Sequence, residues 1–285
     1  MKINTVAPDR HSFLQVLSNI AKCPDKLYYI GTLPELRRPT VAIVGTRKPT
    51  RYGIEVTERL AYDLAKRGVV VISGMALGVD GIAHRAALEA GGTTIAVLGN
   101  GLDNFYPSSH RELAKQIIDS GGAVLSEFEP DVPARQFRFL QRNRIVSGLS
   151  DAIVITEAAA RSGTLNTATN ALEQGKDLFV VPGNITSPMS GGCNKLLQQG
   201  AAPALCADDI IEAIAPHLLQ PQASLALGSN PLETLVIQLL QGGIRDGDEL
   251  QQSCLVTPSE FSQALTMLEI AGTIKPLGGN QWTLR

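Results

Sequence analysis

Short apolar runs alternate with helical patterns and glycine-rich turns through the middle of the chain. Six of these runs are typical of buried strands, at residues 41–44, 69–72, 94–98, 123–125, 151–155 and 177–181. Helices are expected between them, at 52–66, 78–90 and 165–174, with another after Pro107 that would start with a capping box of Ser109 and Glu112. Apolar strands that alternate with helices are typical of a parallel sheet covered on both faces. The pattern therefore predicts an α/β fold, with an extended Rossmann-like, doubly wound and mostly parallel sheet.

A different pattern begins near residue 231. Leucines repeat along one face of a predicted helix, and Thr257 and Glu260 mark the start of a second one. Residues 274–284 surround a Gly-Gly-Asn turn, as in a β-hairpin. Helices followed by a hairpin predict a small C-terminal winged-helix domain.

These patterns divide the chain into four segments. Residues 1–40 hold too little sequence for a domain, and we expect a short helix and an extended arm there. The Rossmann-like domain is expected at 41–219, a linker rich in Pro, Ser and Gly at 220–230, and a winged-helix-like domain at 231–285.

The composition fits a folded protein of the cytoplasm. Of the 285 residues, 44% are hydrophobic and 18% are charged, which is enough apolar sequence to bury a core. No apolar run is long enough to span a membrane, and the polar N-terminus lacks the apolar stretch of a signal peptide. The four cysteines are scattered, without the spacing of metal ligands. We therefore expect a reduced, cytoplasmic protein with no metal site and no contact with membranes.

The charges are distributed unevenly along the chain. The formal net charge is −2, which does not indicate a strongly basic nucleic-acid binder. The segment from Gly228 onward is acidic, whereas arginines gather at 135–144, and a second basic group contains Arg37, Arg38, Arg47, Lys48 and Arg51. Local fields rather than the overall charge would therefore attract an anion.

Four polar or glycine-rich loops follow the predicted strands. They are Gly45–Arg47, Ser73–Gly78, Thr156 and the step Ser162–Thr164, which enters a helix. In a doubly wound sheet such loops meet at the carboxyl ends of the strands, where ligands bind. Backbone N–H groups, hydroxyls and the positive end of a helix dipole favour an anion there. Tight packing could explain any one glycine turn, but the four loops together predict a phosphate-binding edge.

The chain carries no obvious catalytic group. Neither Gly-x-Gly-x-x-Gly after the first strand nor a Walker-type Gly-Lys-Ser/Thr occurs, so the sequence indicates neither the usual dinucleotide site nor the common ATPase mechanism. Asp80 and His84 are one helical turn apart, but no nucleophile matches them, and a structural pair is expected. Cys193 and Glu157 also lack partners for catalysis. We predict no catalytic residues and no cofactor.

Aromatic residues and arginines interleave in the segment Phe137–Arg144. Phosphates need cations, and unpaired bases need flat surfaces to stack on, so this segment could follow a nucleic-acid strand. The alternative is that Phe137 and Phe139 belong to the core and that the arginines are merely solvated.

Several of these residues lie in ordered motifs that resemble those of the DNA-processing protein A (DprA/Smf) family. The motifs are Ala42-Ile-Val-Gly-Thr-Arg47, Ser73-Gly-Met-Ala-Leu-Gly-Val-Asp-Gly-Ile-Ala-His84, Arg142-Asn-Arg-Ile145, Gly148-Leu-Ser150, Ser162-Gly-Thr-Leu165 and Pro182-Gly183. The resemblance implies an extended Rossmann domain that forms homodimers, often with a C-terminal winged helix. It also implies a recombination mediator that binds single-stranded DNA, including DNA taken up in natural transformation, and helps to load the RecA recombinase.

The resemblance also implies roles for single residues. Arg47 would bind a DNA phosphate, while Arg142 and Arg144 would clamp the backbone from a loop. Asp80 and His84 would hold the helix after the second strand in place. The nucleic-acid-binding residues that it implies are Arg47, Ser73, Gly74, Arg142, Asn143, Arg144, Ser162, Gly163 and Thr164.

The chain departs from the family pattern in two places, and one rival function stays open. Leu140 stands where the family usually has proline, and residues 1–40 are too short for the N-terminal helical domain of many members. The acidic C-terminal segment is suited to protein contact or dimer support rather than to reading a major groove. The rival is a nucleotide or nucleoside-phosphate hydrolase of related fold, although this chain has Ala168 where such enzymes carry a glutamate.

Overall fold

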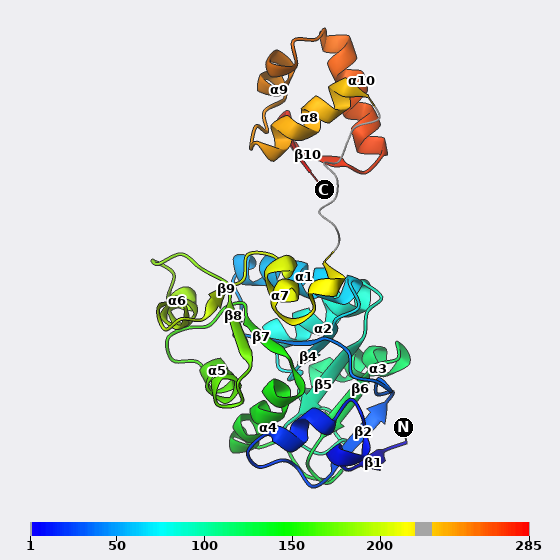
Figure 1. The fold of residues 1–285 in the computed structure, drawn as a ribbon, viewed down its shortest axis with the longest axis vertical. Helices are drawn as coiled ribbons and strands as arrows, with labels where there is room; N and C mark the ends of the chain where they lie inside the picture. Colours follow the sequence, from blue (N-terminus) through cyan, green and yellow to red (C-terminus); the bar gives the residue numbers. More distant parts are fainter. Residues whose placement is uncertain (1, 220–229, 285) are drawn as a thin grey trace. The chain divides into compact units, whose positions relative to one another are not determined.

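A nine-stranded sheet organises the first of two compact units in the chain (Figure 1). The computed structural model describes residues 2–219 and 230–284, and the units comprise Met1–Leu219 and Gln220–Arg285. The strand order is β1-β2-β6-β5-β4-β3-β7-β8-β9. All pairs from β6 across to β9 are parallel, whereas β1 pairs with β2, and β2 with β6, in antiparallel fashion. The mostly parallel α/β sheet predicted from the sequence is therefore confirmed.

The strands form where the apolar runs predicted them, because both faces of the sheet are covered. Alternate residues of β3 point to opposite faces: Val41 and Ile43 join one core cluster, and Ala42 and Val44 join another. The strands are β1 Asn4–Val6, β2 Leu27–Gly31, β3 Thr40–Val44, β4 Val70–Ser73, β5 Thr94–Leu98, β6 Ala123–Ser126, β7 Ala152–Ile155, β8 Asp177–Val180 and β9 Ala202–Pro203.

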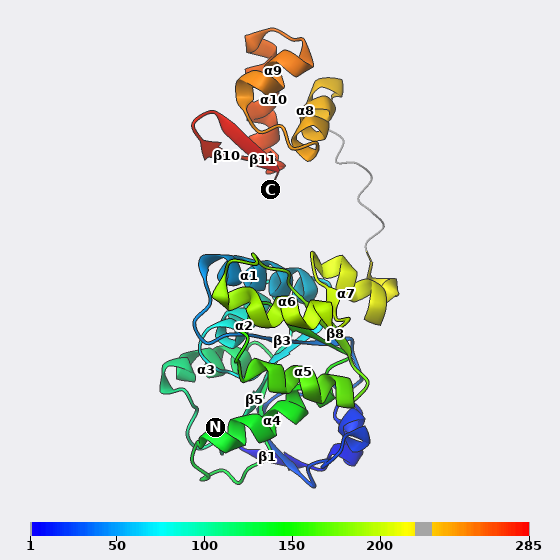
Figure 2. The same cartoon turned by 90° about the vertical axis from the view of Figure 1, so that its left-hand side faces the viewer.

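Two sets of helices cover the two faces (Figure 2). One face carries α1 Arg51–Lys66, α2 Val79–Glu89, α3 Arg111–Asp119 and α7 Ala207–Ile214. The other carries the 3₁₀ helix η2 Gln15–Asn19 with α4 Gln136–Leu149, α5 Thr164–Glu173 and α6 Gly191–Gln198. Four short 3₁₀ helices complete the unit: η1 Pro8–Arg10, η3 Ser108–His110, η4 Pro188–Ser190 and η5 Pro216–Leu218.

Two local predictions were wrong. The motif residues 142–144, expected in a loop, lie in the middle of α4. Ser109 does not cap a helix: it lies inside η3, and α3 begins after His110 without a side-chain cap.

The N-terminal residues differ from the expected short helix and extended arm. Strand β2 pairs with β6 in the sheet, and β1 pairs with β2. Phe13, Leu14 and Leu17 are fully buried in the core cluster beneath α4. Residues 4–31 are therefore part of the first unit, and they extend its sheet rather than stand apart from it.

The second unit has its own core. It contains α8 Pro231–Gln241, α9 Gly247–Cys254 and α10 Pro258–Ile270, followed by the hairpin of β10 Ile274–Gly278 and β11 Gln281–Leu284. Thr257 and Glu260 form the expected capping box, and Phe261, Leu265 and Leu268 point into the core. The predicted helices and hairpin of a winged helix are present. The predicted linker lies outside the described residues, apart from Asn230.

Candidate nucleic-acid interface

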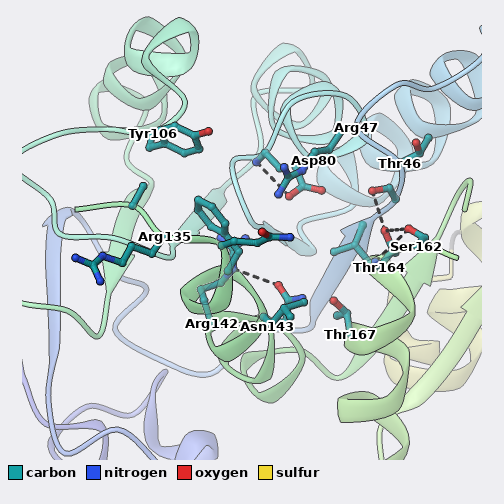
Figure 3. Close-up of a pocket in the computed structure, with 18 of the residues that line it drawn as sticks. Thr46, Arg47, Asp80, Tyr106, Arg135, Arg142, Asn143, Ser162, Thr164 and Thr167 are labelled. Atoms are coloured by element: carbon teal, nitrogen blue, oxygen red, sulfur yellow. Dashed lines mark hydrogen bonds between the residues drawn. The ribbon is translucent and has the colours of Figure 1, made fainter. Parts of the chain in front are cut away.

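A cavity in the first unit lies at the carboxyl ends of β3, β4 and β7. It has a volume of about 650 Å³ and includes the ends of strands on both sides of β3. Strand β3 is followed along the chain by its neighbour β4, whereas its other neighbour, β7, comes much later. The strand order therefore reverses at β3, which is where doubly wound sheets bind ligands. Figure 3 shows Tyr106 and Arg135 on one side of the cavity and Ser162 and Thr164 on the other.

Three exposed arginines line this cavity: Arg47 from the loop after β3, Arg135 just before α4, and Arg161 before α5. None of the three makes an ion pair within the part of the chain that the structure describes. Asp80 is the one carboxylate among the lining residues. The cavity therefore has an excess of positive charge that an anion could neutralise.

An aromatic pair borders the arginines. The rings of Tyr106 and Phe139 are stacked, with centroids 5.4 Å apart. The guanidinium of Arg47 lies over the Phe139 ring, 5.6 Å from its centroid. Phe139 is partly exposed and Phe137 is 51% exposed, so neither side chain belongs to the core. Flat rings beside unpaired cations suit an unstacked base and its phosphate.

Arg142 forms the floor of the cavity rather than a clamp at its surface. It is 5% exposed, and its Nη1 donates to the carbonyl oxygens of Gly74 and Val97, at 2.6 Å in the case of Gly74. Burial lowers the pKa of Arg142 to about 10, against the opposing effect of Asp80. The Arg142 side chain therefore ties α4 to the ends of β4 and β5.

Asp80, in the first turn of α2, holds the loop after β4. Its carboxylate accepts hydrogen bonds from the backbone N–H groups of Gly74 and Ala76, at 3.1 and 3.2 Å. Burial raises the pKa of Asp80, while the charge of Arg142 acts in the opposite direction. Because the Gly74 N–H already donates to Asp80, it is not free to donate to a ligand.

Ser73 and His84 are also used inside the protein. Ser73 is fully buried, and its hydroxyl donates to the carbonyl of Ile43 at 2.6 Å. The His84 Nδ1 lies 2.7 Å from the hydroxyl of Thr94, which itself donates to Val71. Nδ1 must therefore carry the proton and donate, which leaves Nε2 as a buried acceptor with no hydrogen-bond partner among the described residues. Asp80 and His84 do not bond to each other. Asp80 holds the loop after β4, and His84 bonds to Thr94 of β5.

The Ser162–Thr164 step does line the cavity. The Thr164 hydroxyl donates to the carbonyl of Gly45 at 2.9 Å, which joins this step to the loop that carries Arg47. The Ser162 hydroxyl donates to the Thr164 hydroxyl and accepts from its backbone N–H. No atom lies within 4 Å of a Cβ built on Gly163, so the step faces open space at the start of α5.

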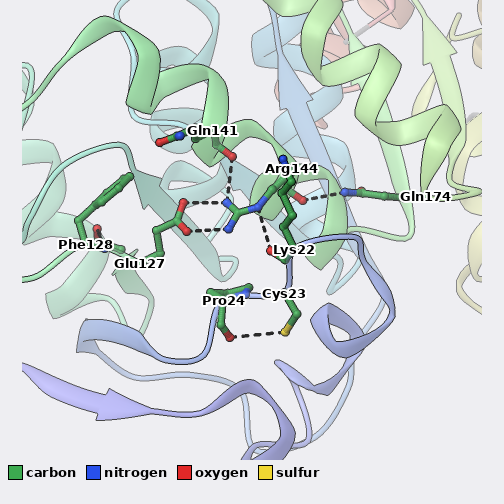
Figure 4. Close-up of polar contacts among 9 residues, drawn as sticks. Lys22, Cys23, Pro24, Glu127, Phe128, Gln141, Arg144 and Gln174 are labelled. Atoms are coloured by element: carbon green, nitrogen blue, oxygen red, sulfur yellow. Dashed lines mark hydrogen bonds and ion pairs between the residues drawn. The ribbon is translucent and has the colours of Figure 1, made fainter.

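Arg144 lines a different hollow from the cavity that Arg47 lines. Its guanidinium makes two hydrogen bonds to the carboxylate of Glu127, at 2.7 and 2.6 Å, and donates to the backbone carbonyl of Lys22 (Figure 4). The lining of the Arg144 hollow includes neither Arg142 nor Asn143. The structure therefore separates the two motif arginines, while Asn143 stays with the first cavity, where its amide reaches Asn166.

Sequence reasoning missed two further arginines as site residues. Arg135 belonged to a recognised arginine group but was not assigned to the site, and Arg161 was overlooked. Tyr106 was missed as well, because it lies far from any motif in the sequence, although it lines the cavity and stacks on Phe139. Its position before Pro107, in a loop after a strand, was the one available signal.

The other candidate groups have structural roles. The Glu157 carboxylate accepts from the backbone N–H and the hydroxyl of Thr50, the residue that caps α1. Cys193 is buried, and burial raises its thiol pKa to about 11. Within residues 2–219 and 230–284, no group of three or more His, Cys, Asp or Glu residues could hold a metal ion. No helix in those ranges is long and apolar enough to cross a membrane.

Two family models match the chain. The model of DNA recombination-mediator protein A matches residues 4–215, and that of the DprA winged helix domain matches residues 220–280. Protein Smf of Escherichia coli is 38% identical over 271 residues, which cover 92% of this chain and 72% of that protein. DNA processing protein DprA of Streptococcus pneumoniae is 41% identical over 195 residues, which cover 68% of each chain.

Solved structures give the same result. The crystal structure of DNA processing protein A from S. pneumoniae superposes with a TM-score of 0.69 at 37% identity, over 75% of each chain. The protein of Helicobacter pylori, whose structure describes a single-stranded DNA binding mode, gives a TM-score of 0.65 at 35% identity. That match covers 75% of this chain and 95% of the other. The α/β fold described above is thus shared with these proteins.

Proposed function

Because this chain belongs to the DNA recombination-mediator protein A family, we propose that its arginine-lined cavity binds single-stranded DNA. We also propose that the protein helps to load RecA onto that DNA, as in natural transformation. It would act in the cytoplasm, as a homodimer and without catalysis. DNA binding is the step on which the other parts of the proposal depend.

One observation carries the proposal. Arg47 lies over Phe139, and Phe139 stacks on Tyr106, at the rim of a cavity with two further exposed, unpaired arginines. The guanidinium groups can pair with phosphates, and the rings can stack on unpaired bases. A duplex keeps its bases stacked and does not offer them to such rings. The site therefore favours a single strand, with little dependence on its sequence.

The test compares Arg47→Ala with a matched control, Arg59→Ala. Arg59 is an exposed arginine of α1 outside the cavities described above, so both variants lose the same charge. Fluorescence anisotropy with oligo-dT should show that Arg47→Ala weakens binding and lowers the slope of log K against log salt by about 0.7. Arg59→Ala should bind like wild type. Equal binding by wild type and Arg47→Ala would contradict the assignment of this cavity as the DNA-binding site.

Two further measurements address the rest of the proposal. RecA assembly on single-stranded DNA should be faster with the wild type than with Arg47→Ala. Incubation with nucleoside monophosphates tests the rival hydrolase function, because release of free base would favour an enzyme. The cavity that would bind such a substrate offers Asp80 as its one carboxylate, and Asp80 is buried and already hydrogen-bonded.

A further inference from the structure

A second hollow lies at the carboxyl edge of the same sheet, beside the end of β8. It has a volume of about 400 Å³, and none of its lining residues lines the arginine cavity. The lining comes from the start of α1, from Glu157 after β7 and from the segment between β8 and α6. The lining residues are Thr50, Tyr52, Glu157, Pro182, Gly183, Asn184, Ser187 and Ser190.

Tyr52 lines this hollow, and a hydrogen bond holds its aromatic ring in place. Its hydroxyl donates to the carbonyl of Pro182 at 2.7 Å, yet 46% of the residue remains exposed. An anchored, half-exposed ring is a surface on which a flat, apolar group can lie.

The hollow itself has no cation in its lining, but two cations lie beside it along the chain: Lys48 precedes Thr50, and Arg51 stands between Thr50 and Tyr52. Lys48 and Arg51 are exposed, and neither makes an ion pair among the described residues. Arg47 lines the first cavity and Thr50 lines the second hollow. Because Arg47 and Thr50 are three residues apart, their Cα atoms are separated by at most about 11 Å. This distance is the length of a few nucleotides.

The sequence grouped these cations with Arg37 and Arg38, but the fold separates them. Arg37 pairs with Asp151 and Arg38 donates to Gly68 and Thr93, all at the amino-terminal edge of the sheet. The five residues of β3 stand between the two groups. Of this basic group, Arg47, Lys48 and Arg51 are therefore the members that lie at the carboxyl edge, where they can accompany a ligand.

We propose that a DNA strand bound in the arginine cavity continues past Lys48 and Arg51, and that one of its bases stacks on Tyr52 in the second hollow. The inference rests on the proposed function, since it extends the path of the same single strand. The two cations would neutralise successive phosphates, and the ring would receive a base of any identity because every base has a flat face. Occupation of the second hollow would lengthen the binding site without a change in sequence preference.

The experiment uses the full chain and two lengths of oligo-dT, about four and about 20 nucleotides. The variants are Tyr52→Ala, which removes the ring, and Tyr52→Phe, which keeps the ring and loses only the bond to Pro182. We expect Tyr52→Ala to bind the long oligonucleotide about ten-fold more weakly than wild type, with little change for the short one. Tyr52→Phe should bind the long oligonucleotide nearly as wild type does.

A double variant and a spectroscopic probe complete the test. Lys48→Ala with Arg51→Ala should weaken binding of the long oligonucleotide and lower its salt slope. Quenching of 2-aminopurine, placed in turn along the long oligonucleotide, should include a position that loses its quenching in Tyr52→Ala but not in Arg59→Ala.

The outcomes separate this inference from the proposed function. If Arg47→Ala weakens both lengths and Tyr52→Ala weakens neither, with no quenching lost, the arginine cavity binds DNA but the second hollow does not. If wild type binds neither length, the proposed function itself fails. Circular dichroism and thermal melting of each variant show whether a loss of binding comes from a loss of fold.

Discussion

Arg142 and Asp80 lie on either side of Gly74, close enough that the glycine leaves no room for a side chain between them. A Cβ on Gly74 would stand 2.5 Å from the Arg142 Nη2 and 2.7 Å from the Asp80 Oδ2. The guanidinium donates to the Gly74 carbonyl, and the carboxylate accepts from the Gly74 N–H. The N–H and the carbonyl of Gly74 are thus hydrogen-bonded to two side chains of opposite charge.

Replacement of Gly74 by alanine should therefore destabilise the protein. Both neighbours of the added methyl group are buried and bonded, so neither can move away without loss of a hydrogen bond. We expect a loss of about 1–3 kcal/mol in the free energy of unfolding, measured in urea. Gly163→Ala is the control, since no atom lies within 4 Å of its Cβ and its φ of −62° suits alanine. A Gly74→Ala protein as stable as that control would show that the loop rearranges freely.

Arg142 should contribute to the stability of the fold, whereas Arg47 should contribute to DNA binding. Arg142→Ala removes both donors to the carbonyls of Gly74 and Val97 and leaves the buried carboxylate of Asp80 uncompensated. Its cost should be about 3–5 kcal/mol in unfolding free energy. Arg47→Ala should leave that free energy within about 0.5 kcal/mol of wild type, because Arg47 is exposed and unpaired, and should weaken DNA binding instead. Similar losses of stability in both variants would contradict this division.

The sequence predicted the sheet well because its signal is local. Each strand from β3 to β8 is an apolar run flanked by turns, and burial on both faces requires such runs. The N-terminal strands β1 and β2 were not predicted, since β2 is held by antiparallel pairing with a strand about a hundred residues away and β1 pairs in turn with β2. Pairing at that distance leaves no periodic pattern in the N-terminal sequence.

The site was predicted only in part, because the position of a residue in the sequence does not show which way its side chain points in the fold. The apolar residues of the segment 136–149 do not repeat on one helical face, so its helix was missed. Once the segment is helical, Arg142 and Arg144 are about 200° apart around the axis and must face different surroundings. Arg47 was placed correctly at the cavity because it directly follows a strand whose carboxyl end fixes it there.

The pairing of Arg144 with Glu127 should be a stability contact rather than a DNA contact. Both side chains are largely buried, at 17% and 15% exposed, and the pair is joined by two hydrogen bonds. A double-mutant cycle with Arg144→Ala and Glu127→Ala should give a coupling free energy of about 1–3 kcal/mol in urea unfolding. Glu127→Ala alone should not strengthen the binding of oligo-dT. Tighter binding in that variant would mean that Arg144, once released, reaches the DNA.

His84 should make the folded protein sensitive to acid. Burial, together with the charges of His110, Arg85 and Arg142, lowers its pKa from 6.5 to about 3. The hydrogen bonds act in the same direction: Nδ1 already donates to Thr94, and a second proton on the buried Nε2 would find no acceptor among the described residues. The unfolded chain binds that proton below about pH 6.5 and the folded one does not, so the contribution of His84 is present above pH 6.5 and is lost as the pH falls towards 3.

The measurement compares wild type with His84→Gln in urea at pH 7.5 and at pH 4.5. Between these values wild type should lose about 2–3 kcal/mol more unfolding free energy than His84→Gln, which has no group to titrate at this position. Asp80, whose pKa burial raises, is present in both proteins, so its opposite dependence on pH cancels from the difference. Equal losses in the two proteins would mean that the folded state opens to protonate His84, and that the bond to Thr94 does not hold the ring in place.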